Sequence, residues 1–175
     1  MTRFRFLADI ALALAFASPA AAQAPAARIP TRNGEVILAT DRDRQDYDQF
    51  GFAPVRRAGD MVFVSGVIAG PRQGEGTDVG AFKQQVRRAF QRIKAELAAA
   101  DLTFDDVVMM NTFHVWHGPN FAGSRDDQFK AFDEVKREFM TGPHPAWTAV
   151  GTTGLLADNG VVEIQMIAEH AHAKP

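Results

Sequence analysis

Two stretches of the sequence have the apolar spacing of amphipathic helices, and strand-forming runs lie before, between and after them. In the first stretch, apolar residues recur every three or four positions, at Val79, Phe82, Val86, Phe90, Ile93 and Leu97. This spacing predicts one buried helix face, with Thr77 or Asp78 as the cap. A second helix is predicted from about Ser124, and its buried side carries Phe129, Phe132, Val135 and Phe139.

Runs of β-branched and aromatic residues predict the strands. The expected extended segments are 35–39, 49–57, 61–65, 105–116, 146–151 and 161–169. The stretch 40–48 carries six charges and is expected to lie in solvent as a connection. The last five of these segments and the two helices give the order ββαβαββ, which predicts an α+β fold, a single mixed sheet with both helices packed on one face.

The face of this sheet that the helices leave uncovered is also expected to be apolar. Its positions are predicted to include Phe63, Val64, Val108 and Met110. A monomer would expose this hydrophobic surface to water, so we expect it to be buried between subunits.

The N-terminus has the pattern of a secretory signal peptide. Arg3 and Arg5 precede the mostly apolar stretch 7–17, and small residues follow up to Ala22. We expect residues 1–22 to be removed, with cleavage after Ala24 or an uncleaved amphipathic anchor as alternatives. A flexible leader is then expected at 23–34, a domain at 35–170 and a tail at 171–175. The apolar stretch is short for a membrane span. The expected location is therefore periplasmic or secreted, away from the membrane once the signal is removed.

Charge and cysteine content exclude several function classes. The chain has 19 Lys and Arg residues against 21 Asp and Glu residues, a net charge of −2, which becomes −3 when Arg3, Arg5 and Asp9 leave with the signal. Nucleic acid is therefore not expected as a partner. Without cysteine there is no disulfide, no thiolate zinc site and no cysteine nucleophile. No metal or other cofactor is expected.

Five segments, in this order and spacing, together resemble the RidA/YjgF family. They are Ala-Gly-Asp-Met-Val-Phe-Val-Ser-Gly at 58–66, Ala-Ala-Ala-Asp-Leu at 98–102, Asp-Asp-Val-Val at 105–108, Pro-Ala-Trp-Thr-Ala-Val-Gly at 145–151 and Val-Glu-Ile-Gln-Met-Ile-Ala at 162–168. The resemblance implies a chorismate-mutase-like fold, a homotrimer whose sheets form a barrel-like core, and ligand clefts between subunits. Archetypal members hydrolyse reactive enamines and imines of 2-oxo acids and release ammonia.

The resemblance also implies which positions line the cleft, and here the chain is a non-archetypal member. That hydrolysis needs a cation for the substrate carboxylate, a positioned water and a group that handles its proton. The catalytic Arg of the family's Pro-Ala-Arg motif is replaced by Trp147, which cannot pair with a carboxylate. Gln165 replaces a Glu, Phe52 replaces a Tyr, and Asp126 corresponds loosely to an Asn. The family's Ser-Gly-Gln turn begins here with Ser65.

The predicted ligand-binding residues are Phe52, Ser65, Trp147, Gln165, His114 and His144. Glu163 shares a strand face with Gln165 and is the candidate catalytic base, although a structural carboxylate is the alternative. His114 or His117 could meet His144 in the cleft, or these imidazoles could be scattered. Three function classes stay open: a protein that binds a small, less anionic or aromatic metabolite, an imine deaminase or related hydrolase with a rewired site, and an interaction protein. The endoribonuclease label that the family has carried is not supported by the slight acidity.

Overall fold

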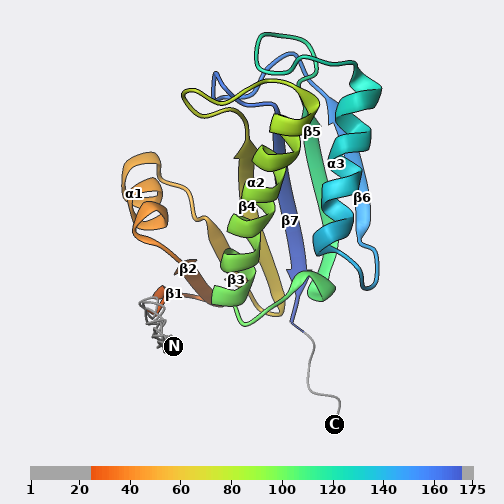
Figure 1. Ribbon diagram of the computed structural model, residues 1–175. Coiled ribbons are helices and arrows are strands. Elements are labelled where there is room, and N and C mark those ends of the chain that lie inside the picture. Colours follow the sequence, from red (N-terminus) through yellow and green to blue (C-terminus); the bar gives the residue numbers. More distant parts are fainter. Residues whose placement is uncertain (1–24, 171–175) are drawn as a thin grey trace, which may run out of the picture.

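The computed structural model describes residues 25–170, which form one mixed sheet covered by helices on one side (Figure 1). The sheet order is β1-β2-β3-β4-β7-β5-β6. All neighbouring strands are antiparallel except β5 and β6, which are parallel. The strands are β1 (Ala27–Thr31), β2 (Gly34–Leu38), β3 (Val55–Ala58), β4 (Met61–Ala69), β5 (Val107–His114), β6 (Ala146–Gly151) and β7 (Val162–Glu169). The helices are α1 (Asp41–Phe50), α2 (Val79–Ala99), α3 (Arg125–Phe139) and the 3₁₀ turn η1 (Phe104–Asp106).

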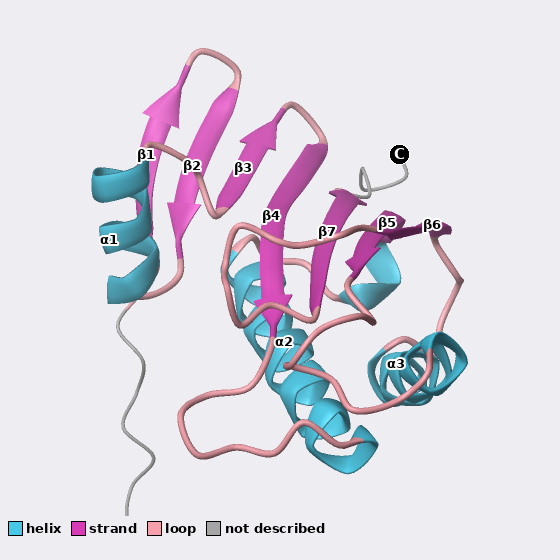
Figure 2. Ribbon diagram, turned by 90° about the horizontal axis from the view of Figure 1, so that it is seen from above, coloured by secondary structure: helices cyan, strands magenta, loops and turns pink. Residues whose placement is uncertain are grey.

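The two predicted helices begin where the sequence predicted them. The Asp78 carboxylate accepts hydrogen bonds from the first backbone N–H groups of α2. The Ser124 hydroxyl and the Asp127 carboxylate form a capping box at the start of α3. Both helices pack on the same face of the sheet (Figure 2), which confirms the predicted α+β arrangement.

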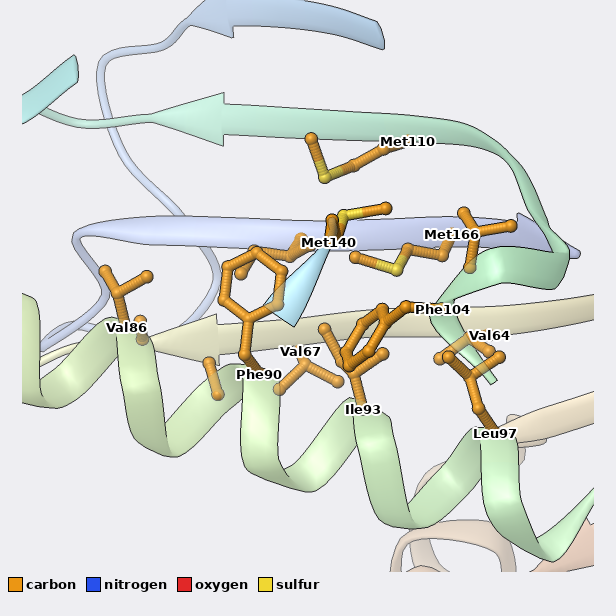
Figure 3. Packing of buried hydrophobic residues seen from close by; sticks show 14 of the residues in the cluster. Val64, Val67, Val86, Phe90, Ile93, Leu97, Phe104, Met110, Met140 and Met166 are labelled. Atoms are coloured by element: carbon orange, nitrogen blue, oxygen red, sulfur yellow. The ribbon is translucent and has the colours of Figure 1, made fainter. Parts of the chain in front are cut away.

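The core lies between these two helices and the sheet. Phe90 of α2 is at its centre, with ring centroids 5.8 Å from Phe132, 5.2 Å from Phe139 and 5.9 Å from Phe104. Figure 3 shows Phe90 and its neighbours on α2 facing Val64, Met110 and Met166 of the sheet. The packing leaves few strand positions on this face accessible to water.

The other face of the sheet, which we call the open face, is apolar and exposed. Phe63 and Val108 are each 41% exposed there. Val64 and Met110 were also predicted for this face, and that prediction is wrong, because both are buried under the helices. Successive strand residues point to opposite faces, so Phe63 and Val64 cannot share one.

The N-terminal part of the domain differs from its prediction. Residues 27–31 form β1 and pair with β2, whereas a flexible leader was expected at 23–34. Helix α1 occupies most of the stretch that was expected to be a solvated connection. A capping box of Thr40 and Asp43 starts α1, and Gly51 ends it with a φ of 70°. Its anchoring by ion pairs, described below, explains why apolar spacing did not predict it.

The predicted signal peptide at 1–22 and the tail at 171–175 lie outside the described residues. Within 25–170, no helix is both long and apolar enough to cross a membrane.

Candidate functional site

Trp147, which is predicted to replace the family's Arg, faces α3. It pairs with Met110 of β5 and so lies on the helix-covered side of edge strand β6. Its ring stacks on Phe129, with centroids 5.2 Å apart and planes 9° apart. The ammonium of Lys136 lies 4.1 Å from the Trp147 ring centroid, a cation–π contact. The Phe129 ring and the Lys136 ammonium, both on α3, therefore hold the indole in place.

The indole N–H of Trp147 begins a buried chain of hydrogen bonds whose directions follow from the chemistry. It donates to the Thr112 hydroxyl at 3.0 Å, and that hydroxyl lies 3.0 Å from Nε2 of His114. Nε2 of Gln128 donates to the carbonyl of Val115 at 2.9 Å, so the Gln128 amide oxygen is the atom 3.0 Å from His114 Nδ1. An amide oxygen only accepts, so Nδ1 carries the imidazole proton and Nε2 accepts from Thr112.

Both ring nitrogens of His114 are therefore occupied, and the environment of the ring favours its neutral form. Burial lowers the pKa of His114, and the hydrogen bond to Gln128 only partly opposes this effect. A neutral imidazole with no free nitrogen cannot take a proton from a ligand. Its place in the structure is that of a positioning residue between Gln128 and Thr112.

A cavity of about 460 Å³ lies beside this chain, between the start of α3 and the ends of β5 and β6. We call it the helix-side pocket; it is lined by His114, Trp116, Arg125, Asp126, Gln128, Phe129, Lys130, Ala149, Val150 and Gly151. Nε of Arg125 pairs with the Asp126 carboxylate at 3.1 Å. Phe129 was predicted on the buried side of its helix, but its side chain is 43% exposed beside this cavity.

Sequence reasoning missed most of this lining. Helical spacing places Arg125 and Lys130 with the polar residues of α3, and nothing in it distinguishes a pocket wall from a solvated face. Trp116 lies against Gly151, where any side chain would overlap its ring, and its N–H donates to His117 Nε2 at 2.6 Å. Trp116, an aromatic residue at the end of the predicted strand 105–116, was the one feature of the sequence that could have indicated this pocket.

Four of the other predicted residues, Phe52, Ser65, Glu163 and Gln165, make up a second set, which we call the sheet-side group. The Ser65 hydroxyl donates to the Ala53 carbonyl at 2.7 Å, which ties β4 to the segment that carries Phe52. A bulge between Val64 and Val67 exposes Gly66, and any side chain at 66 would overlap the Glu163 carboxylate. The Gln165 amide oxygen accepts from Asn111 at 3.2 Å.

Within one protomer the two sets do not meet. Gln165 pairs with Asn111, while Trp147 pairs with the adjacent Met110, so their side chains leave opposite faces of the sheet. His144 is exposed before β6 and does not meet His114, which is level with Gly151 at the far end of that strand. The seven residue steps from His144 to Gly151 span roughly 23 Å in an extended chain. Residues 25–170 hold no cluster of three or more His, Asp or Glu side chains suited to a metal ion.

Comparison with known proteins gives this arrangement its context. A family model described as Endoribonuclease L-PSP matches residues 48–170. The RutC family protein YjgH of Escherichia coli strain K12 is 40% identical over 123 residues, which are 70% of this chain and 85% of that protein. The chain belongs to the RidA/YjgF family. The family match covers every predicted site residue from Phe52 to Gln165.

Other relatives of this RidA/YjgF member agree. A 2-iminobutanoate/2-iminopropanoate deaminase of Dermatophagoides farinae is 31% identical over 111 residues, 63% of this chain and 79% of that protein. The solved structure of YjgH has a TM-score of 0.56 and 38% identity, covering 72% of this chain and 88% of that chain. Escherichia coli TdcF with bound serine has a TM-score of 0.54 and 26% identity, covering 69% and 88%. The predicted RidA/YjgF fold is confirmed.

Proposed function

We propose that this RidA/YjgF protein is exported and binds a small metabolite in clefts between the subunits of a homotrimer, without hydrolysing the imines that archetypal members process. The observation that carries the proposal is the engagement of Trp147. Its N–H donates to Thr112, and its ring stacks on Phe129 and contacts Lys136. Residue 147, which is predicted to match the Arg that holds the substrate carboxylate in archetypal members, thus supplies neither a cation nor a free donor.

The missing cation decides against tight binding of a small anionic imine. Removing one partner of a buried charge pair costs on the order of 4 kcal/mol, which corresponds to roughly a thousandfold in affinity. The helix-side pocket beside Trp147 has a volume of about 460 Å³, in the size range of small-molecule sites. A pocket of this size beside a position without the Arg supports binding rather than turnover.

The separation of the two residue sets supports a cleft shared between copies. The helix-side pocket lies at edge strand β6, while the sheet-side group lies across the sheet near the bulge of β4. The open face offers apolar surface for association, including Phe63 and Val108. A trimer, which the family resemblance implies, would place the pocket of one copy against the sheet-side group of another.

The alternative is an imine deaminase or related hydrolase with a rewired site. Two observations favour it. The Glu163 carboxylate fills the space that a side chain at Gly66 would take, and one relative at 31% identity is named a 2-iminobutanoate/2-iminopropanoate deaminase. In that case Glu163 would be the base and a different cation would hold the substrate.

Ammonia release separates the two functions. We expect the wild-type protein to release no ammonia from 2-iminopropanoate, generated in place by an amino-acid oxidase. Trp147→Arg, alone or with Lys136→Gln to remove the neighbouring cation, is expected to gain activity. Wild-type turnover that is lost in Glu163→Gln would establish the alternative, and an inactive set of folded Arg variants would show that the missing Arg is not the decisive change.

Export rests on the predicted signal at residues 1–22. Expression of the full chain in a bacterial host, followed by fractionation and N-terminal sequencing, is expected to give a periplasmic protein that begins at Gln23. Recovery of a cytoplasmic protein with its N-terminus intact would overturn this part of the proposal and leave the binding function to be tested separately.

A further inference from the structure

Resting on the proposed binding function, we infer that the helix-side pocket takes an aromatic monocarboxylate, with its ring against Phe129 and its carboxylate at Arg125 and Lys130. The inference moves the anion contact from β6, where Trp147 stands, to the first turns of α3. It also requires that the ligand has a larger apolar part than a small 2-imino acid has.

The size and walls of the pocket argue for an apolar ligand body. Its volume of about 460 Å³ is far more than a three-carbon acid fills. One wall consists of residues 149–151 of β6, which offer the Ala149 methyl and backbone groups, and another is the ring of Trp116. Filling this space with a small anion would leave apolar surface in contact with trapped water, whereas a ring would displace that water.

Phe129 provides a rigid platform for a ring. It lines the pocket and is 43% exposed, whereas Trp147, on which it stacks, does not line the pocket. Trp147 is in turn held by Thr112, the first member of the buried hydrogen-bond chain. An aromatic side chain fixed in this way loses little conformational entropy when a ligand stacks on it.

The charges at the pocket favour a single anion. Arg125 and Lys130 are the lining cations and Asp126 is the lining acid, a balance of one positive charge once His114 is neutral. Arg125 engages Asp126 through Nε, which leaves its two terminal NH₂ groups for a second carboxylate. Among the described residues, Lys130 forms no ion pair closer than 4 Å. A carboxylate complements this arrangement, and a neutral amide of the same shape does not.

The test compares three probes by isothermal titration calorimetry at low salt, on the protein that begins at Gln23. They are phenylacetate, its neutral isostere phenylacetamide, and pyruvate. We expect phenylacetate to bind at least tenfold more tightly than either of the others. We also expect a change in tryptophan fluorescence on binding, because Trp116 lines the pocket and Trp147 lies behind Phe129.

Variants then assign the contacts. Arg125→Gln combined with Lys130→Gln is expected to weaken phenylacetate binding at least tenfold, while Arg137→Gln, which removes an exposed cation of the same helix, leaves it unchanged. Phe129→Leu is expected to weaken phenylacetate and to leave pyruvate unaffected, with circular dichroism confirming that each variant is folded.

Equal affinity for phenylacetate and phenylacetamide would overturn the carboxylate contact. Failure of phenylacetate to bind at millimolar concentration would overturn the inference as a whole. If pyruvate binds more tightly than phenylacetate, the inference fails while the proposed binding function stands. Ammonia release from imines would instead remove the proposed function, so the two failures are distinguishable.

Discussion

The Thr112 hydroxyl is shared by two side chains that the sequence does not connect. It accepts from the Trp147 indole and donates to the His114 imidazole, and it is completely buried. A single hydroxyl therefore orients both the ring behind the pocket and the imidazole in its wall. His114 was a predicted ligand-binding residue, but its polar atoms are engaged with Thr112 and Gln128.

Thr112→Val tests this role because valine keeps the shape and removes the hydroxyl. The Trp147 N–H and the His114 Nε2 would both lose their partner in a water-excluded site, so we expect the free energy of unfolding to fall by about 2–4 kcal/mol. The measurement is urea unfolding followed by circular dichroism. Thr148→Val, an exposed position on neighbouring β6, is the matched control and should change stability little. A loss no larger than that of the control would contradict the assigned chain.

Helix α1 is attached to the body of the protein by charge. Its only buried residue is Asp43, which is 1% exposed. The guanidinium of Arg92 on α2 contacts Asp43 at 3.1 Å, Asp46 at 3.5 Å and Glu96 at 2.8 Å. Three carboxylates thus surround one cation, and Oε2 of Glu96 is buried with no hydrogen-bond partner among the described residues.

Because the carboxylates outnumber the guanidinium, the contact is more stable when Glu96 holds a proton. Burial raises the pKa of Glu96 to about 7, even though Arg92 opposes the shift, and the carboxylates of Asp43 and Asp46 add to it. A raised pKa favours the protonated folded state, so the stabilisation is complete below the ordinary pKa of about 4.5 and is lost as the pH rises to about 7. Above that pH the ionised Glu96 adds a further negative charge to the contact, which weakens the attachment of α1.

Glu96→Gln is the test, because glutamine resembles the protonated acid. We expect the free energy of unfolding of the variant, relative to wild type, to rise by roughly 2–3 kcal/mol between pH 4.5 and pH 8. Hydrogen exchange in residues 41–50 should show the same change locally. Glu134→Gln, an exposed acid paired with Lys83, is the control. Parallel stability curves for wild type and Glu96→Gln would show that folding does not raise the pKa of Glu96.

The same contact explains which elements were predictable. Helices α2 and α3 bury apolar faces, and their spacing in the sequence revealed them. Helix α1 has no apolar stripe, and the charges that suggested a solvated connection are the groups that attach it to Arg92. A charge pattern does not state which distant residue neutralises it, so this element could not be predicted from local sequence.

The whole molecule presents one covered and one uncovered sheet face. Phe63, Val108 and Val150 are between 41% and 43% exposed on the open face, next to the polar side chains of Gln165 and Asn111. Contiguous apolar surface of this kind marks an association site in a protein that folds alone. The proposed trimer would cover it and complete the clefts.

Phe63→Glu is expected to dissociate the trimer, because the new carboxylate would be buried without a partner. Native mass spectrometry of the wild type should give three copies, and of the variant mainly one. Leu156→Glu places the same change on a fully exposed loop residue and should leave the assembly intact. A monomeric wild type would contradict the trimer and the shared cleft together.

The sequence by itself determined the core elements, because helical and strand periodicity are local. The predicted replacements at Trp147, Gln165 and Phe52 also rest on the sequence alone. Only the tertiary structure decided where those residues point, because register is set by pairing between strands far apart in the chain. That pairing places Trp147 and Gln165 on opposite faces, separates His114 from His144, and brings Arg125, Lys130 and Phe129 around one pocket.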